Sequence, residues 1–424
     1  MHNLSQAWKS PRDAEHRGEL PSLSRRIARY LDRIKHGHPL KGRAPGRDAI
    51  ELWSNDYLAL SGHPAIVRAQ VNVLEGGGDD LFMSAAYLSE RTPQRIVERK
   101  MAAFLGVEDS VICQSGWCAN VGLVQSIAHK DTPVYIDVMA HASLWEGARS
   151  AGAPIRPFRH NDPESLETQI RKFGPGVIVV DAVYSIDGSV CPLPEVAEIG
   201  ACYGCIVVVD ESHSIGVWGD MGRGMVSQLG LADRVHYRTF SLSKAFVTRA
   251  GVVAGPARVM KFFPYESRPA IFSSAVLPHE MAGLDAALSV IREDEWRREK
   301  LKRNADDLRG RLGEMGYNVD DSRSQIMALE VGFERQTTVL RDALERHGIF
   351  GAVFCPPATP KNRSLIRFSV NCGLGERELD RVVEVCRAIR DEVAMRQWPS
   401  TRRKERGERA TGGPVALDPL SASA

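Results

Sequence analysis

The sequence predicts an α/β protein with a mostly parallel central sheet. Two continuous apolar runs, Val177–Asp181 and Cys205–Asp210, each end in an aspartate, and such runs suit parallel strands buried on both faces. Helical spacing near Pro194–Tyr203 lies between them, which completes a βαβ unit. Val134–Asp137 and Gly251–Ala254 are predicted as further strands. Because ligands on such sheets gather at the carboxyl ends of strands, we expect the functional site there.

A second, smaller α+β domain is predicted over residues 279–395. It begins with a long charged helix that carries one apolar stripe, formed by Leu301, Ala305, Leu308 and Leu312. Shorter strands follow at Ile326–Val331 and Leu365–Val370, and the last helix spans roughly Glu376–Val393.

The chain therefore divides into four parts. Residues 1–50 form an arm with one helix, because only Leu23–Ile34 shows helical spacing there. Residues 51–278 form the large domain and residues 279–395 the small one. Residues 396–424 combine a basic cluster with a Gly/Pro/Ala/Ser stretch, so we expect a disordered, solvated tail. An acidic partner for that cluster is the rival interpretation.

Composition and charge exclude several classes of protein. The 424 residues are 43% hydrophobic and 25% charged, as in soluble globular proteins. The net charge of +2 gives no reason to expect nucleic acid or an anionic membrane as a partner. The N-terminus lacks an apolar signal core, and no apolar run reaches the ~18 residues of a membrane span, so we expect a cytoplasmic protein. The eight cysteines are expected to be free thiols, and the lone Cys202-x-x-Cys205 pair is no metal site because a second ligand pair is missing.

The strongest chemical signal surrounds Lys244. This lysine follows the hydroxyl residues of Thr239–Ser243 and precedes a Gly-containing strand, as a Schiff-base nucleophile would. Asp210 and His213 stand in Asp-Glu-Ser-His, where a buried strand ends. An acid there can keep a pyridinium nitrogen protonated, the central demand of pyridoxal 5′-phosphate (PLP) chemistry. Alone, Asp210 would be a helix cap and Lys244 a surface charge; together they indicate a PLP site.

Two further motifs support that interpretation. In Gln114–Asn120, a Ser-Gly pair precedes helix-compatible residues, so free backbone N–H groups there can face a phosphate. In Asp137–Ser143, the imidazole of His141 could lie flat on a pyridine ring, although a surface histidine is the simpler interpretation of that residue alone. Neither motif is specific by itself.

Taken together, these motifs resemble the α-oxoamine synthase family of fold type I PLP enzymes. Its members include 5-aminolevulinate synthase, 8-amino-7-oxononanoate synthase, glycine C-acetyltransferase and serine palmitoyltransferase. The resemblance runs in order from Asn55-Asp-Tyr-Leu58 to about residue 390, and it includes Tyr184–Gly188, Gly222–Gly224, Ile271–Ser274 and Ile366–Ser369. It implies a homodimeric acyltransferase that joins an amino-acid-derived carbanion to the acyl group of an acyl-CoA.

The resemblance also implies a role for each ring-facing residue. Lys244 would be the Schiff-base lysine and the base for the α-proton. Asp210 would pair with the ring nitrogen, and His213, aided by Ser185, with the phenolic oxygen. His141 would stack on the ring.

The cofactor phosphate would be held from two subunits. The resemblance implies that Gly116 and Trp117 offer backbone N–H groups to it and Ser241 its hydroxyl. Ser273 and Ser274 would reach the phosphate of the neighbouring subunit, which would make the dimer obligate.

On the substrate side, Arg367 would bind the amino acid's carboxylate, with Asn55 close by. Leu81–Leu88 departs from the Gly/Ser-rich stretch of many members, which argues against glycine as substrate. Five segments instead resemble the cholera-type α-hydroxyketone autoinducer synthases: Phe82–Ala85, Gln114–Trp117, His141–Gly147, Pro269–Ser274 and Phe354–Asn362. That branch implies S-adenosylmethionine or 2-aminobutyrate as amine donor and a medium-chain acyl-CoA as acceptor. The product would be an aminoketone or enaminone precursor of a quorum-sensing signal.

The sequence leaves three rival functions open. A housekeeping α-oxoamine synthase, serving biotin or haem synthesis for example, shares all the motifs above. A fold type I aminotransferase fits the Ser-Gly-Trp and Asp-Glu-Ser-His motifs poorly. A non-catalytic PLP-binding regulator would need a DNA-binding module, for which residues 1–50 are too short and too poor in helical pattern.

Overall fold

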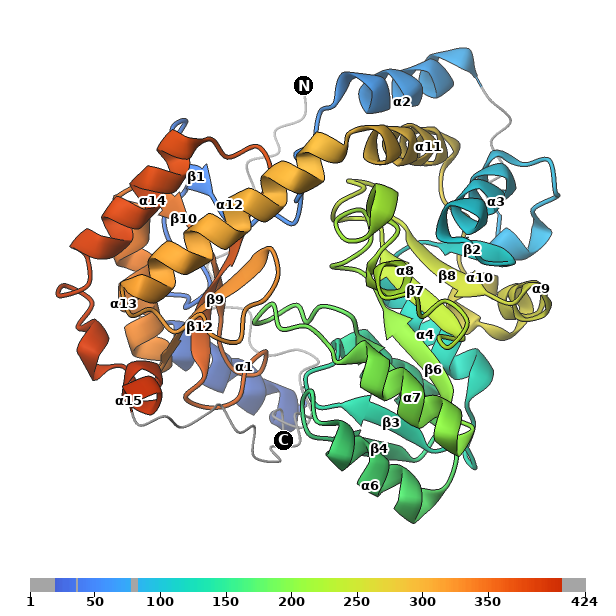
Figure 1. The fold of residues 1–424 in the computed structure, drawn as a ribbon, viewed down its shortest axis with the longest axis horizontal. Helices are drawn as coiled ribbons and strands as arrows, with labels where there is room; N and C mark the ends of the chain where they lie inside the picture. Colours follow the sequence, from blue (N-terminus) through green and yellow to red (C-terminus); the bar gives the residue numbers. More distant parts are fainter. Residues whose placement is uncertain (1–19, 36, 78–82, 406–424) are drawn as a thin grey trace.

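Seven strands form the central sheet, in the spatial order β2-β8-β7-β6-β5-β3-β4 (Figure 1). The computed structural model describes residues 20–35, 37–77 and 83–405. The strands are β2 (Asp109–Cys113), β3 (Val134–Asp137), β4 (Ile155–Phe158), β5 (Val177–Asp181), β6 (Ile206–Asp210), β7 (Tyr237–Ser241) and β8 (Gly251–Gly255). Strands β4, β3, β5, β6 and β7 pair in parallel, whereas β8 runs antiparallel to both of its neighbours. The predicted α/β fold with a mostly parallel sheet is thus confirmed.

The apolar runs of the sheet are buried on both faces. Within β5, Val177 and Val179 join one hydrophobic cluster, while Ile178 and Val180 join the other. The first cluster also contains residues of α4 (Gly116–Ile127), α5 (Ala142–Ser150), α9 (Ala257–Glu266) and α10 (Arg268–Ile271). The second contains residues of α3 (Pro93–Leu105), α6 (Pro163–Phe173), α7 (Leu193–Tyr203), α8 (Met225–Gln228) and α11 (Pro278–Glu293). Continuous Val/Ile sequences therefore encode a sheet covered on both sides.

A smaller lobe is built on the antiparallel sheet β11-β12-β9. Its strands are β11 (Ala352–Phe354), β12 (Ser364–Ser369) and β9 (Ile326–Gly332), and its helices are α12 (Glu295–Glu314), α13 (Glu334–Arg346) and α14 (Glu376–Ala388). Figure 1 shows α12 running diagonally across this lobe from the end of α11. All four stripe residues predicted for α12 are buried.

The smaller lobe includes a segment that we expected in the large domain. Strand β1 (Ile50–Glu51) pairs in parallel with β10 (Ile349–Phe350). The amide of Ser369 then donates to the carbonyl of Leu52 at 2.6 Å, and the amide of Cys372 to that of Tyr57 at 2.9 Å. Backbone hydrogen bonding therefore attaches residues 50–57 to strands of the smaller lobe, whereas we expected residues 51–57 in the large domain. From there the chain passes to α2 (Pro64–Gly76), which packs against α11.

Helices lie near both ends of the described chain. The arm contains α1 (Pro21–Ile34), as expected, yet none of its side chains is fully buried. At the other end, the short turn η3 (Met395–Gln397) and α15 (Pro399–Glu405) are helical, and Trp398 between them is only 1% exposed. Helical structure thus reaches residue 405, beyond the start at residue 396 that we expected for the tail. The rest of the expected tail lies outside the described residues.

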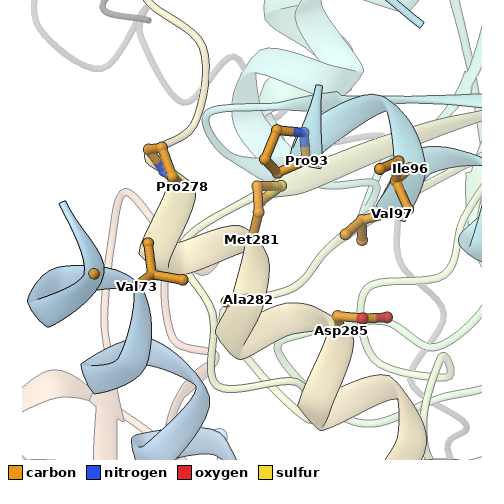
Figure 2. A pocket seen from close by; sticks show the side chains of 9 residues that line it. Val73, Pro93, Ile96, Val97, Pro278, Met281, Ala282 and Asp285 are labelled. Carbon is orange, nitrogen blue, oxygen red and sulfur yellow. The ribbon is translucent and has the colours of Figure 1, made fainter. Parts of the chain in front are cut away.

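An apolar groove of about 500 Å³ lies between α2, α3 and α11 (Figure 2). Its lining includes Val73, Ile96, Val97 and Met281, and the carboxylate of Asp285 lies at one end. None of the predicted site residues lines this groove. Two short turns, η1 (Ala85–Tyr87) and η2 (Asp220–Gly222), complete the elements. Within the described ranges, no helix combines the length and the apolar character that crossing a membrane requires.

Candidate active site

The predicted residues converge where the parallel strands end. Asp137, Asp181, Asp210 and Ser241 are the last residues of β3, β5, β6 and β7. Because these strands are parallel, the four ends share one edge of the sheet. Asp181 and Asp210 are direct register partners there. This edge matches the place where ligands bind on open α/β sheets.

Asp210 is a buried carboxylate with two hydrogen-bond donors. It is 4% exposed, and its Oδ2 accepts from Nδ2 of Asn120 at 2.6 Å, while Oδ1 accepts from the amide of Ser212 at 2.8 Å. The amide oxygen of Asn120 in turn accepts from the hydroxyl of Thr239 at 2.5 Å. These hydrogen bonds fix the orientation of the carboxyl group at the end of β6.

Lys244 lies in the turn after β7 and is partly buried. Burial lowers the pKa of its amine, although the neighbouring carboxylate of Asp210 opposes the shift. A lysine whose pKa is lowered presents more of its neutral, nucleophilic form. The surroundings of Lys244 thus suit covalent attachment to an aldehyde.

His213 meets a tyrosine from the smaller lobe. Its Nδ1 lies 2.7 Å from the hydroxyl of Tyr57, and its carbonyl accepts from the side-chain amide of Gln325 at 2.7 Å. Burial, together with the positive charge of nearby Lys244, lowers the pKa of His213 well below its ordinary value. The lowered pKa favours the neutral imidazole, and both partners come from the smaller lobe: Tyr57 holds the ring and Gln325 holds the backbone carbonyl.

His141 presents its ring beside Trp117. The residue caps α5, its Nδ1 lies 2.7 Å from the hydroxyl of Ser143, and the two aromatic rings meet nearly edge-on with centroids 6.1 Å apart. The side chain is exposed, yet the surrounding protein removes enough solvent to lower its pKa. A neutral, solvent-facing imidazole is suited to stacking on a flat ring.

Arg367 and Asn55 lie together, as the resemblance implied. Nη2 of Arg367 donates to Oδ1 of Asn55 at 2.9 Å, and Nη1 donates to the carbonyl of Ser185 at 2.8 Å. The guanidinium carbon is 5.0 Å from the centre of the Phe354 ring. Its Nε is buried without a hydrogen-bond partner among the described residues. An orphaned guanidinium donor of this kind suits a carboxylate ligand.

The start of α4 forms a cradle for an anion. Ser115 caps the helix by accepting from the amide of Cys118 at 3.1 Å, which leaves the first backbone N–H groups, those of Gly116 and Trp117, available. A Cβ atom at Gly116 would lie 2.6 Å from Cβ of Ser241, so only glycine fits there. The hydroxyl of Ser241 lies 2.8 Å from that of Ser243. The cradle has the chemistry of a phosphate site.

Ser273 and Ser274 lie in the turn after α10. The hydroxyl of Ser273 donates to the carbonyl of Pro269, and Ser274 is exposed while its carbonyl accepts from the side-chain amide of Gln114. Gln114 directly precedes the phosphate cradle. The turn is thus held at the rim of the site, with Ser274 facing solvent in the single chain.

The chain is similar to known proteins over most of its length. The family model for class I and II aminotransferases matches residues 47–385. A CAI-1 autoinducer synthase from Vibrio campbellii is 44% identical over 349 residues, which cover 82% of this chain and 88% of that protein. The chain belongs to the α-oxoamine synthase family. Another relative of this α-oxoamine synthase, the 8-amino-7-oxononanoate synthase 1 of Bacillus velezensis, is 32% identical over 82% of the chain and 90% of that protein.

Solved structures agree with this assignment. A serine palmitoyltransferase from S. paucimobilis with a bound PLP–myriocin aldimine has a TM-score of 0.79 and 26% identity to the chain, covering 84% of this chain and 91% of that one. As a member of the family, the protein is a PLP-dependent acyltransferase. The residues present fit the cofactor: the Gly116 cradle suits its phosphate, and buried Asp210 suits its ring nitrogen.

Sequence reasoning missed four residues of this site. Asn120 and Tyr57 lie inside motifs that we singled out but received no role, and Asp181 ends a strand that we used only for the fold. Gln325 lies in none of the motifs named above. The signal for the first three was available: polar residues inside a motif or at a strand end. Gln325 could be found only from the three-dimensional arrangement.

Proposed function

We propose that this α-oxoamine synthase condenses a carbanion derived from S-adenosylmethionine or 2-aminobutyrate with a medium-chain acyl-CoA. The product is an aminoketone or enaminone that becomes an α-hydroxyketone quorum-sensing signal. The observation that carries the proposal is the 44% identity to a CAI-1 autoinducer synthase, against 32% to an 8-amino-7-oxononanoate synthase over the same share of the chain.

Each polar residue of the site has a task in this reaction. PLP, when bound, supplies the electron sink that stabilises the carbanion. Lys244 would hold the cofactor, and its Nζ, once the substrate amine has replaced it, would accept the α-proton. Asp210 would keep the ring nitrogen protonated, His213 with Ser185 would face the phenolic oxygen, and His141 would cover one face of the ring.

Arg367 orients the amino substrate. Its unpartnered Nε and its position beside Asn55 support a role in holding the substrate carboxylate. A guanidinium that grips a carboxylate fixes which bond stands perpendicular to the ring, and such orientation is a large part of enzymatic rate enhancement. The carbon–carbon bond would then form at the thioester carbonyl as coenzyme A leaves as its thiol, and loss of the carboxylate as carbon dioxide would give the aminoketone.

Exposed apolar side chains favour the proposal of a medium-length acyl chain. Met83 and Tyr87, from the described part of Leu81–Leu88, are exposed, and so is Phe272. The carbonyl of Met83 accepts from the amide of Ala275 at 2.7 Å, so this segment lies against the turn of Ser273 and Ser274. Leu81 and Phe82 lie outside the described residues. Each buried methylene contributes about 0.8 kcal/mol, so eight extra carbons offer at most about 6 kcal/mol before ordering costs.

We further propose a homodimer in which Ser273 and Ser274 reach the phosphate of the partner subunit. The exposure of Ser274 and of Phe272, which is 81% exposed in the single chain, supports this arrangement. Mixing Lys244→Ala subunits with Ser273→Ala/Ser274→Ala subunits should give hybrids that contain one intact site. A fully active monomer at assay concentration would rule the shared site out.

Product analysis tests the proposed reaction. The purified holoenzyme is incubated with decanoyl-CoA and S-adenosylmethionine or 2-aminobutyrate, and organic extracts are examined by mass spectrometry. We expect a long-chain aminoketone or enaminone that Lys244→Ala protein does not form. The second candidate, a housekeeping synthase of the 8-amino-7-oxononanoate type, is supported by the 32% relative, and it would instead give product from alanine and pimeloyl-CoA.

A further inference from the structure

Asp181 is a buried carboxyl group that the proposed reaction does not use. It ends β5, is 3% exposed, and is the register partner of Asp210 on β6. On the other side, β3 ends in Asp137. The charged or titratable groups that act on Asp181 are Asp210, Asp137 and Lys244.

The hydrogen bonding of the three carboxyl groups differs sharply. Asp210 accepts from Asn120 and from the amide of Ser212, both within 2.8 Å. Asp137 accepts from the hydroxyl of Tyr184 at 2.9 Å, from the amide of Met139 at 2.8 Å, and from other donors. Among the described residues, Asp181 has a single, longer hydrogen bond, which its Oδ1 accepts from the backbone amide of His141 at 3.3 Å.

This difference decides where a proton resides. Two adjacent buried carboxyl groups cannot both ionise at low cost, and the one with more donors keeps the charge. Asp210 has the better donors, so a proton shared by the pair favours Asp181. Burial and the charge of Asp210 accordingly raise the pKa of Asp181 well above its ordinary value.

The hydrogen bond of Asp181 holds His141, the residue proposed to cover the cofactor ring. His141 begins α5, and its backbone amide is the group that Asp181 holds. The imidazole that would cover the cofactor is thereby tied to the end of β5. Loss of this tie would free the start of α5 to shift relative to the sheet.

We propose that Asp181 is a positioning residue: it is protonated in the working enzyme, it holds His141 against the cofactor, and it leaves Asp210 as the only charged carboxylate that faces the ring nitrogen. The inference rests on the proposed placement of the cofactor against Asp210 and His141. It assigns to Asp181 a hydrogen-bonding task that needs no charge.

Substitution by asparagine separates hydrogen bonding from charge. Asp181→Asn keeps an acceptor of the same shape and is neutral, whereas Asp181→Ala removes the acceptor. Two properties of the holoenzymes are compared with wild type: the pH midpoint of the cofactor's visible absorbance, and its visible circular dichroism, which reports how the ring is held. Steady-state kcat/KM is the third readout.

The proposal predicts that Asp181→Asn keeps the wild-type midpoint and dichroism, with kcat/KM within about threefold. It predicts that Asp181→Ala loses much of the dichroism and about tenfold or more in kcat/KM, because small misplacements of catalytic groups are costly. A shift of the midpoint by about one unit in Asp181→Asn would mean that a charge had been removed, and would overturn the proposal. Wild-type dichroism and activity in Asp181→Ala would overturn it as well.

Asp210→Asn distinguishes this inference from the proposed site itself. If Asp210→Asn leaves both the midpoint and the turnover unchanged, the cofactor is not placed as proposed, whatever Asp181 does. If Asp210→Asn behaves as expected while Asp181→Asn fails as Asp181→Ala does, only the inference about Asp181 is wrong.

Discussion

The phenolic oxygen of Tyr57 lies 2.7 Å from Nδ1 of His213, although 156 residues separate the two in the chain. Tyr57 follows the strand that joins the smaller lobe, and His213 follows β6 of the large sheet. The hydroxyl is also 3.2 Å from Oδ1 of Asn55, which in turn accepts from Arg367. One phenol therefore connects the group proposed to face the cofactor with the group proposed to bind the substrate.

The first prediction concerns this connection. Tyr57→Phe leaves Nδ1 of buried His213 without its partner, and an unsatisfied buried polar group costs about 1–3 kcal/mol. We expect kcat/KM to fall by about tenfold with cofactor still bound. Tyr317→Phe is the matched control, since its hydroxyl donates to the carbonyl of Cys386 in the smaller lobe at 2.8 Å. Equal activity of Tyr57→Phe and wild type would remove Tyr57 from the site.

The second prediction identifies the attachment point. Borohydride should fix PLP irreversibly to wild-type protein, and peptide mapping should find it on Lys244. Lys244→Ala should bind no cofactor that borohydride can fix, because the amine that forms the bond is gone. Fixation on another lysine of the wild-type protein would show that the assignment is wrong.

The third prediction tests the charge at the end of β6. Asp210→Asn should retain PLP yet lose about 10²–10³-fold in kcat, the size of effect seen when one preorganised electrostatic group is removed. A neutral amide cannot keep the ring nitrogen protonated, so the carbanion loses its electron sink. Cofactor content is measured by absorbance and turnover by release of coenzyme A; near-normal turnover would contradict the role.

The fourth prediction concerns stability and pH. Nδ1 of His160 lies 3.0 Å from Oδ1 of Asp137, and its Nε2 lies 2.9 Å from the hydroxyl of Ser189. Burial alone would lower its pKa, but Asp137, Asp187 and Asp321 together raise it above the ordinary 6.5. A raised folded-state pKa stabilises the protein fully below the unfolded-state value, and this stabilisation is lost as the pH rises through the folded-state value.

His160→Gln should remove that pH dependence. In urea unfolding, wild type should exceed His160→Gln in stability by more at about pH 6 than at about pH 9. A stability difference that stays constant between the two pH values would show that His160 does not bind its proton more tightly in the folded protein.

Much of this architecture is local in the sequence, and the part that is not could not be predicted. Strand β5 was predicted to the residue because a Val/Ile run ending in aspartate has few alternatives in a parallel sheet. The position of Tyr57 was not predicted. It depends on the pairing of β1 with β10, which joins residues some 300 apart in the chain, and no local pattern encodes that pairing. Trp398 makes the same point: in sequence it stands next to a basic, loop-like stretch, and only its burial shows that the packed chain continues to it.

The roles of individual side chains depended on resemblance rather than on pattern. Nothing in the spacing of Asn55 and Arg367 indicates that they meet, yet the structure places them 2.9 Å apart. Asp181 illustrates the opposite case. It looks the same as Asp210 in sequence, an acid that ends a buried strand, and only the donors around each carboxylate separate their tasks.

The most direct test of the proposed function is kcat/KM of the purified holoenzyme across a series of acyl-CoA substrates from acetyl to dodecanoyl, and succinyl. S-adenosylmethionine, 2-aminobutyrate, glycine, serine and alanine serve as donors. We predict that octanoyl- to dodecanoyl-CoA with S-adenosylmethionine or 2-aminobutyrate is best, exceeding acetyl- and succinyl-CoA by at least about 100-fold, because each added methylene can be buried. Best activity with glycine and a short acyl-CoA would contradict the autoinducer function and leave a housekeeping α-oxoamine synthase.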